Sequence, residues 1–562
     1  MVEANKPIRK TLRPCKEESV NWDTTENLYI EGDNLEVLKL LQNSYLGKVK
    51  MIYIDPPYNT GNDFIYNDDF KMSSDEYAEE SGTFDDEGNR MFKNTDSNGR
   101  FHSDWCSMIY SRLILARNLL SDDGVIFISI DDNEQENLKK ICCDVFGEQN
   151  FIECLKWKRK KQPSFLAKHT AKVMEYVLVY SKNYYNLEKL SIENISDSTK
   201  KVINLTNNYS KRIFKAGVKV KSIDDGIIPK GKYIIKTMEI EYLEDIYVCS
   251  GRTQNEVNVL AKFSVTQEKI DEYIKEDLLF ITINNGLRRN VSEDELSKRK
   301  SITDLLLDWG DNQDSENEMK RIFGANYFDY TKPTKLIYNI TKSVSENDFI
   351  VLDFFSGSAT TAHAVMQLNA EDGGNRKFIM VQLPEKTDEK SEAYKAGYKN
   401  ICEIGKERIR RAGNKIKEEN PLTTANLDTG FRVFKIDDSN MKDVYYTPTD
   451  YNQNLLDILE SNIKEDRTDL DLLFGCLLDW GLPLSMAYTS ENINGYTVHT
   501  YNDGDLIACF DENISKEVII NIAKRQPLRA VFRDSSFKSS PDKINVTEIF
   551  KFYAPDTRVK VI

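Results

Sequence analysis

Long apolar runs, paired cysteines and clustered histidines are all missing from this 562-residue chain. No run of about 18 apolar residues occurs, so we predict no transmembrane helix, and the opening MVEANKPIRKTLRP lacks the apolar centre of a signal peptide. The nine cysteines are scattered without a C-x-x-C pair, a pattern typical of reduced thiols in the cytoplasm. The four histidines lie far apart and none has a cysteine at zinc-site spacing, so we predict no metal site.

Two glycine-rich nucleotide motifs are missing as well. The chain has no G-x-x-x-x-G-K-[ST] phosphate loop and no G-x-G-x-x-G fingerprint. An activity that needs ATP would therefore come from another protein. Hydrophobic residues make up 40% of the chain and charged residues 30%, which is an ordinary globular composition. A chain of this length is expected to form three or four domains.

Net positive charge is missing from the chain as a whole, because its formal charge is −15. Taken alone, this argues against a nucleic-acid partner. The charge is uneven, however, and residues 151–220 hold 15 Lys and Arg against 5 acids, including KWKRKKQ at 156–162. Aromatic residues are interleaved with these bases. The segment is either a solvated basic surface or a groove that contacts phosphates, and the aromatic residues favour the groove.

Short apolar runs bounded by turn signals predict buried parallel strands at 27–30, 49–54, 124–130, 349–355 and 377–383. Helical patterns, with apolar residues three and four apart, lie between them, as in LEVLKLLQNS and CSMIYSRLILARNLL. FIECLKWK and VMEYVLVYSK predict two more strands, in a hairpin at a sheet edge. Alternating strands and helices predict an open α/β sheet with right-handed crossovers, whose ligands bind at the carboxyl ends of the strands.

The pattern changes twice along the chain. One stretch is polar and rich in Asn, Lys and Tyr, and it separates two halves of the sheet. A charged helix ends near Pro421, and the tail beyond it mixes short strands with helices. We therefore expect an N-terminal half of the sheet domain at 1–185, an inserted domain at 186–320, the second half at 321–425 and an α+β C-terminal domain, a candidate assembly domain, at 426–562.

The segment DFFSGSATT at 353–361 predicts a strand, a tight loop of small residues and the start of a helix. Such a loop lets a ligand approach the backbone, and the helix N-terminus offers free N–H groups. As a binding motif it is weak when taken alone, because small loops after strands are common. We interpret His363, in the helix that follows, as a core or surface histidine rather than a catalyst.

The segment DPPY at 55–58 is more specific, because it places a carboxylate, two prolines and an aromatic ring at the end of a buried strand. Each proline fixes φ and removes an N–H, so this backbone presents acceptors and not donors. The Asp55 carboxylate and the Pro56 carbonyl together match an amino group with two N–H donors, and the Tyr58 ring can stack on the base that carries it. A proline-rich turn would explain Pro56 and Pro57 but not the flanking Asp and Tyr.

These residues resemble the amino-group DNA methyltransferases, which use S-adenosylmethionine to methylate adenine N6 or cytosine N4. DPPY is similar to their catalytic motif and DFFSGSATT to their cofactor motif, and the catalytic motif comes first by about 300 residues. This circularly permuted order resembles the β-class, whose target-recognition domain lies between the motifs. Longer stretches, such as IYIDPPYNTGNDFIYNDDF, FDYTKPTKLI and GKERIRRAG, resemble the modification subunits of type III restriction–modification systems. The resemblance covers about 25–185 and 320–445 and fades in the insert.

The resemblance implies a Rossmann-like, S-adenosylmethionine-dependent methyltransferase sheet, with residues 186–320 as the target-recognition domain. In the catalytic motif of Asp55, Pro56, Pro57 and Tyr58, the first two would hold the amino group of an adenine flipped out of duplex DNA, and Tyr58 would stack on the base. Methyl transfer would be direct, without a covalent enzyme intermediate. The implied cofactor contacts are Asp33, Asp55, Lys332, Pro333, Asp353, Phe355, Ser356, Gly357 and Gln382.

Two positions depart from the family pattern. The last glycine of the cofactor loop is Ala359, whose methyl group adds little bulk. Many relatives end the next strand with an acid for the ribose hydroxyls, and here that position is Gln382. Its amide can still bond a hydroxyl, as a neutral partner. Glu385, three residues on, is the alternative, and we favour Gln382.

The leading expectation is a site-specific adenine-N6 DNA methyltransferase, the modification and recognition subunit of a type III system, in the bacterial cytoplasm at the nucleoid. The resemblance also implies double-stranded DNA as substrate, a homodimer, and an ATP-dependent restriction subunit (a helicase-nuclease) as a possible partner, with no membrane. Three alternatives stay open: a solitary regulatory methyltransferase, N4-cytosine specificity, and a DNA-binding subunit without catalysis.

Overall fold

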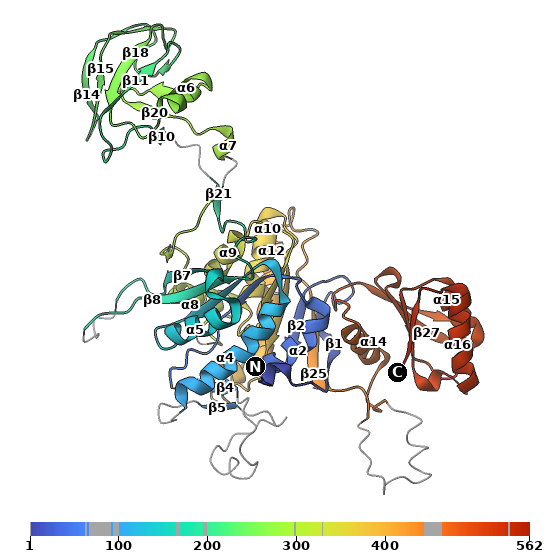
Figure 1. Ribbon diagram of the computed structural model, residues 1–562. Coiled ribbons are helices and arrows are strands. Elements are labelled where there is room, and N and C mark those ends of the chain that lie inside the picture. Colours follow the sequence, from blue (N-terminus) through green and yellow to red (C-terminus); the bar gives the residue numbers. More distant parts are fainter. Residues whose placement is uncertain are drawn as a thin grey trace. The chain divides into compact units, whose positions relative to one another are not determined.

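The computed structural model describes residues 2–61, 64–66, 91–93, 100–163, 169–194, 199–235, 237–296, 299–328, 330–442, 463–537 and 540–562. The chain divides into two compact units (Figure 1). Unit 1 combines residues 1–188 with 303–562, and unit 2 is residues 189–302. Each unit has an apolar core of its own.

A ten-stranded sheet forms the centre of unit 1, in the order β1-β25-β2-β24-β23-β3-β6-β8-β7-β22. Its strands are β1 (Lys10–Val20), β2 (Leu28–Glu31), β3 (Val49–Ile54), β6 (Leu120–Ile130), β7 (Phe151–Lys158), β8 (Met174–Ser181), β22 (Leu305–Leu306), β23 (Ile350–Asp353), β24 (Lys377–Gln382) and β25 (Phe431–Asp438). The strands from β25 to β6 are parallel, whereas β7 and β8 form an antiparallel hairpin near one edge. The predicted α/β fold and the predicted hairpin are both confirmed.

Helices surround this sheet in two packed sets, and its central strands are buried along nearly their whole length. The first set is α2 (Asn34–Tyr45), α4 (Phe101–Leu119) and α5 (Gln135–Phe146), and the second is α9 (Thr334–Ser343), α10 (Thr360–Asp372) and α12 (Ile401–Glu419). Smaller elements are α1 (Val2–Asn5), α8 (Asn312–Phe323), α11 (Glu392–Lys395) and the ribbon of β4 (Phe64–Tyr66) with β5 (Met91–Lys93). Among the described residues, no helix combines the length and apolar character needed to cross a membrane.

The large sheet continues past residue 425, the boundary expected from the sequence. β25 lies between β1 and β2, antiparallel to the former and parallel to the latter. β1 was not expected as a strand, because KTLRPCKEESV is mostly polar and its pairing is interrupted between Cys15 and Val20. Leu12 and Phe434 are nevertheless fully buried, so both strands contribute to the core.

The rest of the tail forms a smaller α/β body within unit 1. Its sheet contains β26 (Tyr488–Ile493), β27 (Tyr496–Tyr501), β28 (Leu506–Cys509), β29 (Arg529–Phe532) and β30 (Arg558–Val561), and its helices are α14 (Asp469–Asp479), α15 (Lys516–Lys524) and α16 (Ser540–Tyr553). Arg432 on β25 joins this body to the large sheet. Its buried guanidinium donates to the carbonyls of Trp22 (2.8 Å), Leu484 (2.8 Å) and Met486 (2.9 Å). The tail is thus fixed to the sheet by hydrogen bonds shielded from water.

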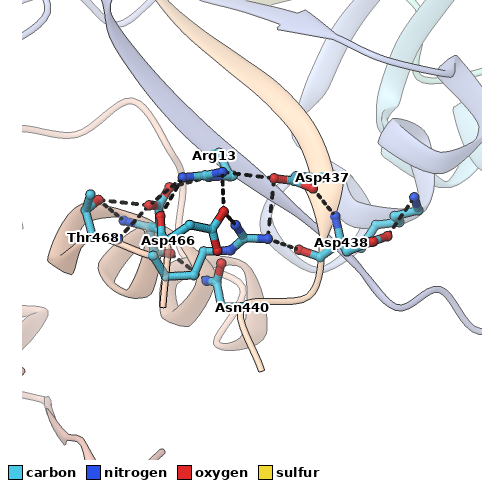
Figure 2. A network of polar contacts seen from close by, with 9 residues as sticks. Arg13, Asp437, Asp438, Asn440, Asp466 and Thr468 are labelled. Carbon is cyan, nitrogen blue, oxygen red and sulfur yellow. Dashed lines mark hydrogen bonds and ion pairs between the residues drawn. The ribbon is translucent and has the colours of Figure 1, made fainter. Parts of the chain in front are cut away.

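A network of charged residues also joins β1, β25 and α14 (Figure 2). Arg13 on β1 bonds Asp437 on β25 at 3.1 Å and Asp471 on α14 at 3.1 Å. Arg467 pairs with the same Asp437 at 3.3 Å and with Asp466. The hydrogen bonds with Asp471 and Asp437 outweigh partial burial and raise the pKa of Arg13. These ion pairs therefore add to the hydrogen bonds by which Arg432 connects the tail to the large sheet.

Unit 2 consists mainly of short strands. A seven-stranded sheet contains β10 (Lys200–Lys201), β12 (Lys219–Val220), β13 (Gly226–Ile228), β16 (Ile246–Cys249), β17 (Arg252–Thr253), β19 (Leu279–Ile281) and β20 (Leu287–Arg289), and a four-stranded sheet contains β11 (Ser210–Phe214), β14 (Gly231–Ile235), β15 (Met238–Tyr242) and β18 (Val257–Ala261). The helices are α6 (Gln267–Lys275) and α7 (Glu293–Leu296). Near the ends of the unit, β9 (Glu193–Asn194) pairs antiparallel with β21 (Arg299–Lys300).

Candidate active site

Four neighbouring strands of the large sheet lead into polar residues that the sequence singled out. Asp55 directly follows β3, Asp353 ends β23, Gln382 ends β24 and Asp33 lies two residues after β2. These strands are parallel and adjacent in the order β2-β24-β23-β3, so their carboxyl ends share one edge of the sheet. The fold therefore brings the predicted catalytic and cofactor residues together.

The Asp55 carboxylate is bonded to a buried lysine. Lys332 Nζ lies 2.9 Å from Oδ1 and 2.8 Å from Oδ2 of Asp55, and the Tyr58 hydroxyl donates to Oδ1 at 3.0 Å. Burial opposes the charge of Lys332, but the carboxylates of Asp55 and Glu175 outweigh it and raise the pKa of Lys332. Pro333, next in the chain, is the N-cap residue of α9. The lysine that the resemblance assigned to the cofactor thus bonds the carboxylate that was predicted to be catalytic.

The backbone of the DPPY motif is held from α4 and from the start of α5, whose N-cap residue is Glu134. Trp105 Nε1 on α4 donates to the Pro57 carbonyl at 2.7 Å, and Pro56 is buried. Asn59 follows in a left-handed conformation with a φ of 57°. Its amide donates to the fully buried Glu134 at 2.6 Å. The motif is thereby held in one conformation before any substrate binds.

A second carboxylate, Glu175 on β8, lies beside Asp55 and was missed in the sequence. Its side chain is 7% exposed and accepts from Arg159 at 2.8 Å and from the Tyr58 hydroxyl at 3.3 Å. Its Oε2 lies 3.9 Å from Lys332 Nζ. Burial raises the pKa of Glu175, and the two cations oppose that rise. The sequence did hold one signal, because the strand VMEYVLVYSK is apolar except for this acid. An acid is almost never fully buried without a partner, so its position implied that a partner lies nearby.

The loop predicted to bind the cofactor, called the cofactor loop below, begins at Asp353, which is buried. Its carboxylate accepts from the Phe355 amide at 3.1 Å and from the Thr361 hydroxyl at 2.6 Å, yet burial outweighs these bonds and raises the pKa of Asp353 to about 7. Gly357 and Ala359 both have left-handed backbone, with φ of 50° and 61°. The alanine at the family's glycine position therefore carries strain of about 1 kcal/mol.

Ser356 and Gln382 connect this loop to β24. The Ser356 amide donates to the Val381 carbonyl at 3.2 Å, and Gln382 Oε1 accepts from the Gly357 amide at 2.7 Å. Gln382 Nε2 donates to its neighbour's carbonyl at 3.1 Å. Glu385 differs, because burial alone raises the pKa of its carboxyl to about 7. Unlike the Gln382 amide, its carboxylate makes no hydrogen bond to the described residues.

Arg408 on α12 is a further residue that sequence reasoning missed. Its fully buried guanidinium donates to the hydroxyls of Ser358 (2.8 Å), Thr360 (2.7 Å) and Thr334 (3.1 Å). It therefore ties the cofactor loop to α9, the helix that follows Lys332. Burial lowers the pKa of Arg408 to about 10. In the sequence, Arg408 belongs to the basic segment GKERIRRAG. Basic helices usually lie on the surface, so nothing in the segment indicated a buried arginine.

Asp33 and His363 are both engaged within the fold. Asp33 caps α2 by accepting from the amides of Leu35 (2.8 Å) and Glu36 (3.1 Å), and Arg112 lies 3.4 Å from its carboxylate. Burial and the charge of Arg408 lower the pKa of His363 to about 3, so this histidine is neutral. That agrees with its interpretation as a core or surface histidine rather than a catalyst.

Several known proteins are similar to this chain in sequence over most of its length. The sequence pattern of the DNA methylase family matches residues 49–412. The type III restriction-modification enzyme StyLTI Mod subunit of Salmonella typhimurium is 37% identical over 444 residues, which cover 78% of this chain and 62% of that subunit. The EcoP15I Mod subunit of Escherichia coli is 32% identical over 98% of this chain and 87% of its own length.

Among solved structures, the PvuII DNA methyltransferase (cytosine-N4-specific) covers 70% of this chain and 94% of its own, at 14% identity and a TM-score of 0.32. A likeness that distant adds nothing to the sequence match. The chain spans less than two thirds of the StyLTI subunit but most of the EcoP15I subunit. Because the family pattern covers more than half of its residues, this chain belongs to the DNA methylase family.

Proposed function

We propose that this chain transfers a methyl group from S-adenosylmethionine to the N6 amino group of an adenine in duplex DNA. One observation carries the proposal: Asp55 directly follows β3, and the loop that starts at Asp353 follows the neighbouring strand β23. An acceptor for an amine therefore lies beside a loop suited to a cofactor. The rigid Pro56 and Pro57 remove backbone donors at this point, which favours an incoming donor group.

The buried charges beside the loop suit S-adenosylmethionine. Burial raises the pKa of both Asp353 and Glu385 to about 7, and no cation of the chain is among the causes. A ligand with positive charge and hydroxyl donors would compensate these carboxylates. When bound, the cofactor supplies a methyl group activated on a positively charged sulfur.

We assign the contacts as follows. Asp353, Phe355, Ser356 and Gly357 line the cofactor, Lys332 and Pro333 lie at its methionine end, and Asp33 lies at its adenosyl end. Gln382 is the ribose contact favoured by the sequence, but both ends of its amide already bond the protein. The geometry favours Glu385 instead.

The work of the protein residues is to orient the amine. Asp55 and the Pro56 carbonyl accept one N–H each, which directs the nitrogen lone pair toward the methyl carbon. Positive charge builds on the nitrogen as the new bond forms, and the Asp55 carboxylate stabilises it. A proton is then lost to water, so Asp55 need not act as a strong base. Tyr58 supplies a ring face for a base that has left the DNA stack.

We further propose a type III modification subunit acting on adenine. The similarity to the EcoP15I Mod subunit extends over 98% of this chain and thus includes unit 2 and the tail. Unit 2 would select the DNA sequence. It carries 20 Lys and Arg against 17 Asp and Glu, a positive balance in a chain with a net charge of −15. The tail would mediate homodimer formation or contact with a restriction subunit.

Methyl transfer to DNA tests the proposal. The purified chain should move labelled methyl groups from S-adenosylmethionine to unmodified DNA, and Asp55→Ala should slow this at least about 100-fold. Asp122→Ala, an exposed aspartate on β6, is the matched control. Equal rates for Asp55→Ala and wild type would overturn the assignment. Single-molecule sequencing of DNA from a host carrying this chain should show modified adenine, and modified cytosine would contradict the adenine proposal.

A further inference from the structure

The Lys332 ammonium contacts both oxygens of the Asp55 carboxylate, at 2.9 and 2.8 Å. The Tyr58 hydroxyl adds a third bond to the same group. A carboxylate offers about four lone-pair directions, so three of them are already used. An ammonium at this distance also cancels most of the negative charge of Asp55.

This arrangement conflicts with methyl transfer, on which the inference rests. The target amine needs an Asp55 oxygen that is free and negatively charged. Positive charge develops on the amine nitrogen as the methyl group arrives, and a neighbouring ammonium repels it. Lys332 therefore has to leave Asp55 before the reaction.

A displaced ammonium cannot remain unpaired in this site. The Lys332 side chain is 9% exposed, and a buried charge without a partner costs several kcal/mol. Glu175 Oε2 already forms a long ion pair with its nitrogen at 3.9 Å, so a shift of about 1 Å brings the two to hydrogen-bond distance. The rings of Tyr58 and Trp157 lie 5.0 and 5.9 Å from the nitrogen and favour a cation along this path.

We propose that Glu175 is a positioning residue that takes the Lys332 ammonium from Asp55 when the target base enters. Arg159 keeps its bond to Glu175 Oε1, while Oε2 receives Lys332. The negative charge of Asp55 is then no longer compensated by Lys332, and an oxygen is free for the amine. The Tyr58 hydroxyl contacts both carboxylates, so it can donate a hydrogen bond to either one before and after the exchange.

The variants for the test are Glu175→Gln, Lys332→Met, the double variant, and Glu175→Asp. Glutamine keeps the size of Glu175 but removes the charge that attracts Lys332. Glu153→Gln is the matched control, because Glu153 is exposed on the neighbouring strand β7. Thermal unfolding of each variant identifies any that fail to fold.

Two readouts separate positioning from structure. The first is the single-turnover rate of methyl transfer at saturating S-adenosylmethionine. We expect Glu175→Gln to lower it about 30-fold and Glu175→Asp to recover part of that loss. In the Lys332→Met background, Glu175→Gln should change the rate less than about twofold, because no ammonium remains to be moved. Additive losses in the double variant would overturn the proposal.

The second readout needs no turnover. Duplexes carrying either the target adenine or a purine without the amino group, at the position located by sequencing, are compared for their Kd. Wild type should prefer adenine about 10-fold, whereas Glu175→Gln should prefer it less than about twofold. Equal preference in both proteins would overturn the exchange. A wild-type protein that keeps the preference but transfers no methyl group would overturn the proposed function and leave the exchange supported.

Discussion

Gln382 Oε1 lies 2.7 Å from the backbone nitrogen of Gly357 and accepts its hydrogen bond. The amide nitrogen of Gln382 donates to Leu383 at 3.1 Å, so both ends of the side chain bond the protein. Gln382 thus holds the cofactor loop in shape. We therefore propose that Glu385, three residues on, contacts the ribose hydroxyls through its carboxylate.

Glu385→Gln should weaken S-adenosylmethionine binding about 10-fold, because a charge-assisted hydrogen bond to a hydroxyl becomes a neutral one. Isothermal titration calorimetry measures the change in Kd. Glu389→Gln, an exposed glutamate nearby, should bind like wild type. If Glu385→Gln binds normally while Gln382→Ala loses more than about 10-fold without any change in Tm, the ribose contact belongs to Gln382.

S-adenosylmethionine binding should strengthen as the pH rises through about 7. The pKa of Asp353 is raised to about 7 by burial, so this carboxyl is partly protonated at neutral pH in the free protein. A bound cation favours the ionised form, and binding therefore releases a proton. Glu385 has a pKa of about 7 for the same reason and contributes to the same range. Kd measured from pH 5.5 to 8.5 should fall with rising pH, and Asp353→Asn should flatten the curve; a Kd independent of pH would contradict the assignment.

The raised pKa also fixes the sign of a stability effect. In the unfolded chain Asp353 ionises near pH 3.8, whereas in the folded protein it ionises near 7. Ionising it inside the fold is unfavourable, so the ligand-free protein should lose stability as the pH rises from about 4 to 7 through this group. Asp353→Asn removes that component.

Arg408→Met should destabilise unit 1 by about 2 to 3 kcal/mol, because three buried hydroxyls lose their donor. It should also weaken S-adenosylmethionine binding, since Ser358 and Thr360 belong to the cofactor loop. Urea unfolding and calorimetry measure the two effects. Arg411→Met, a more exposed arginine on the same helix, should cost less than about 0.5 kcal/mol. Loss of stability with an unchanged Kd would mean that Arg408 does not shape the loop.

Arg432→Met should separate the tail from the large sheet. Three backbone carbonyls would lose their buried donor, at a cost of about 3 kcal/mol. We expect a lower Tm and faster proteolytic cleavage near Leu484. Arg525→Met removes an exposed pair with Glu491 and should change neither measurement. An unchanged Tm for Arg432→Met would show that Arg432 is not needed to hold the tail to the large sheet.

The parts of the fold that could be predicted from the sequence are those with a clear local pattern of apolar residues. VKMIYI and KFIMVQL are continuous apolar runs, and only a buried parallel sheet makes such runs favourable. β1 escaped notice because its alternation is broken by charges that pair with distant residues, among them Arg13 with Asp471. Arg13 and Asp471 lie 458 positions apart in the chain, so their pairing leaves no local pattern.

The candidate site likewise contains residues that could be predicted from the sequence and residues that could not. Asp55 and Asp353 belong to contiguous motifs and could be recognised from a few letters. Arg408 and Glu175 act through contacts with other elements, so their importance depends on what the fold brings beside them. The bond between Lys332 and Asp55 spans 277 positions and joins two motifs that were each predicted without the other.

Because we propose that unit 2 selects the DNA sequence, the pairing of β9 with β21 bears on how new specificities would arise. The two chain segments near the ends of unit 2 run side by side as one short stem. We therefore expect that a gene segment encoding residues 189–302 could be exchanged between two such proteins, with the stem keeping both splice points at a fixed spacing. The catalytic sheet stays intact through such a recombination, because none of its ten strands lies inside the exchanged segment.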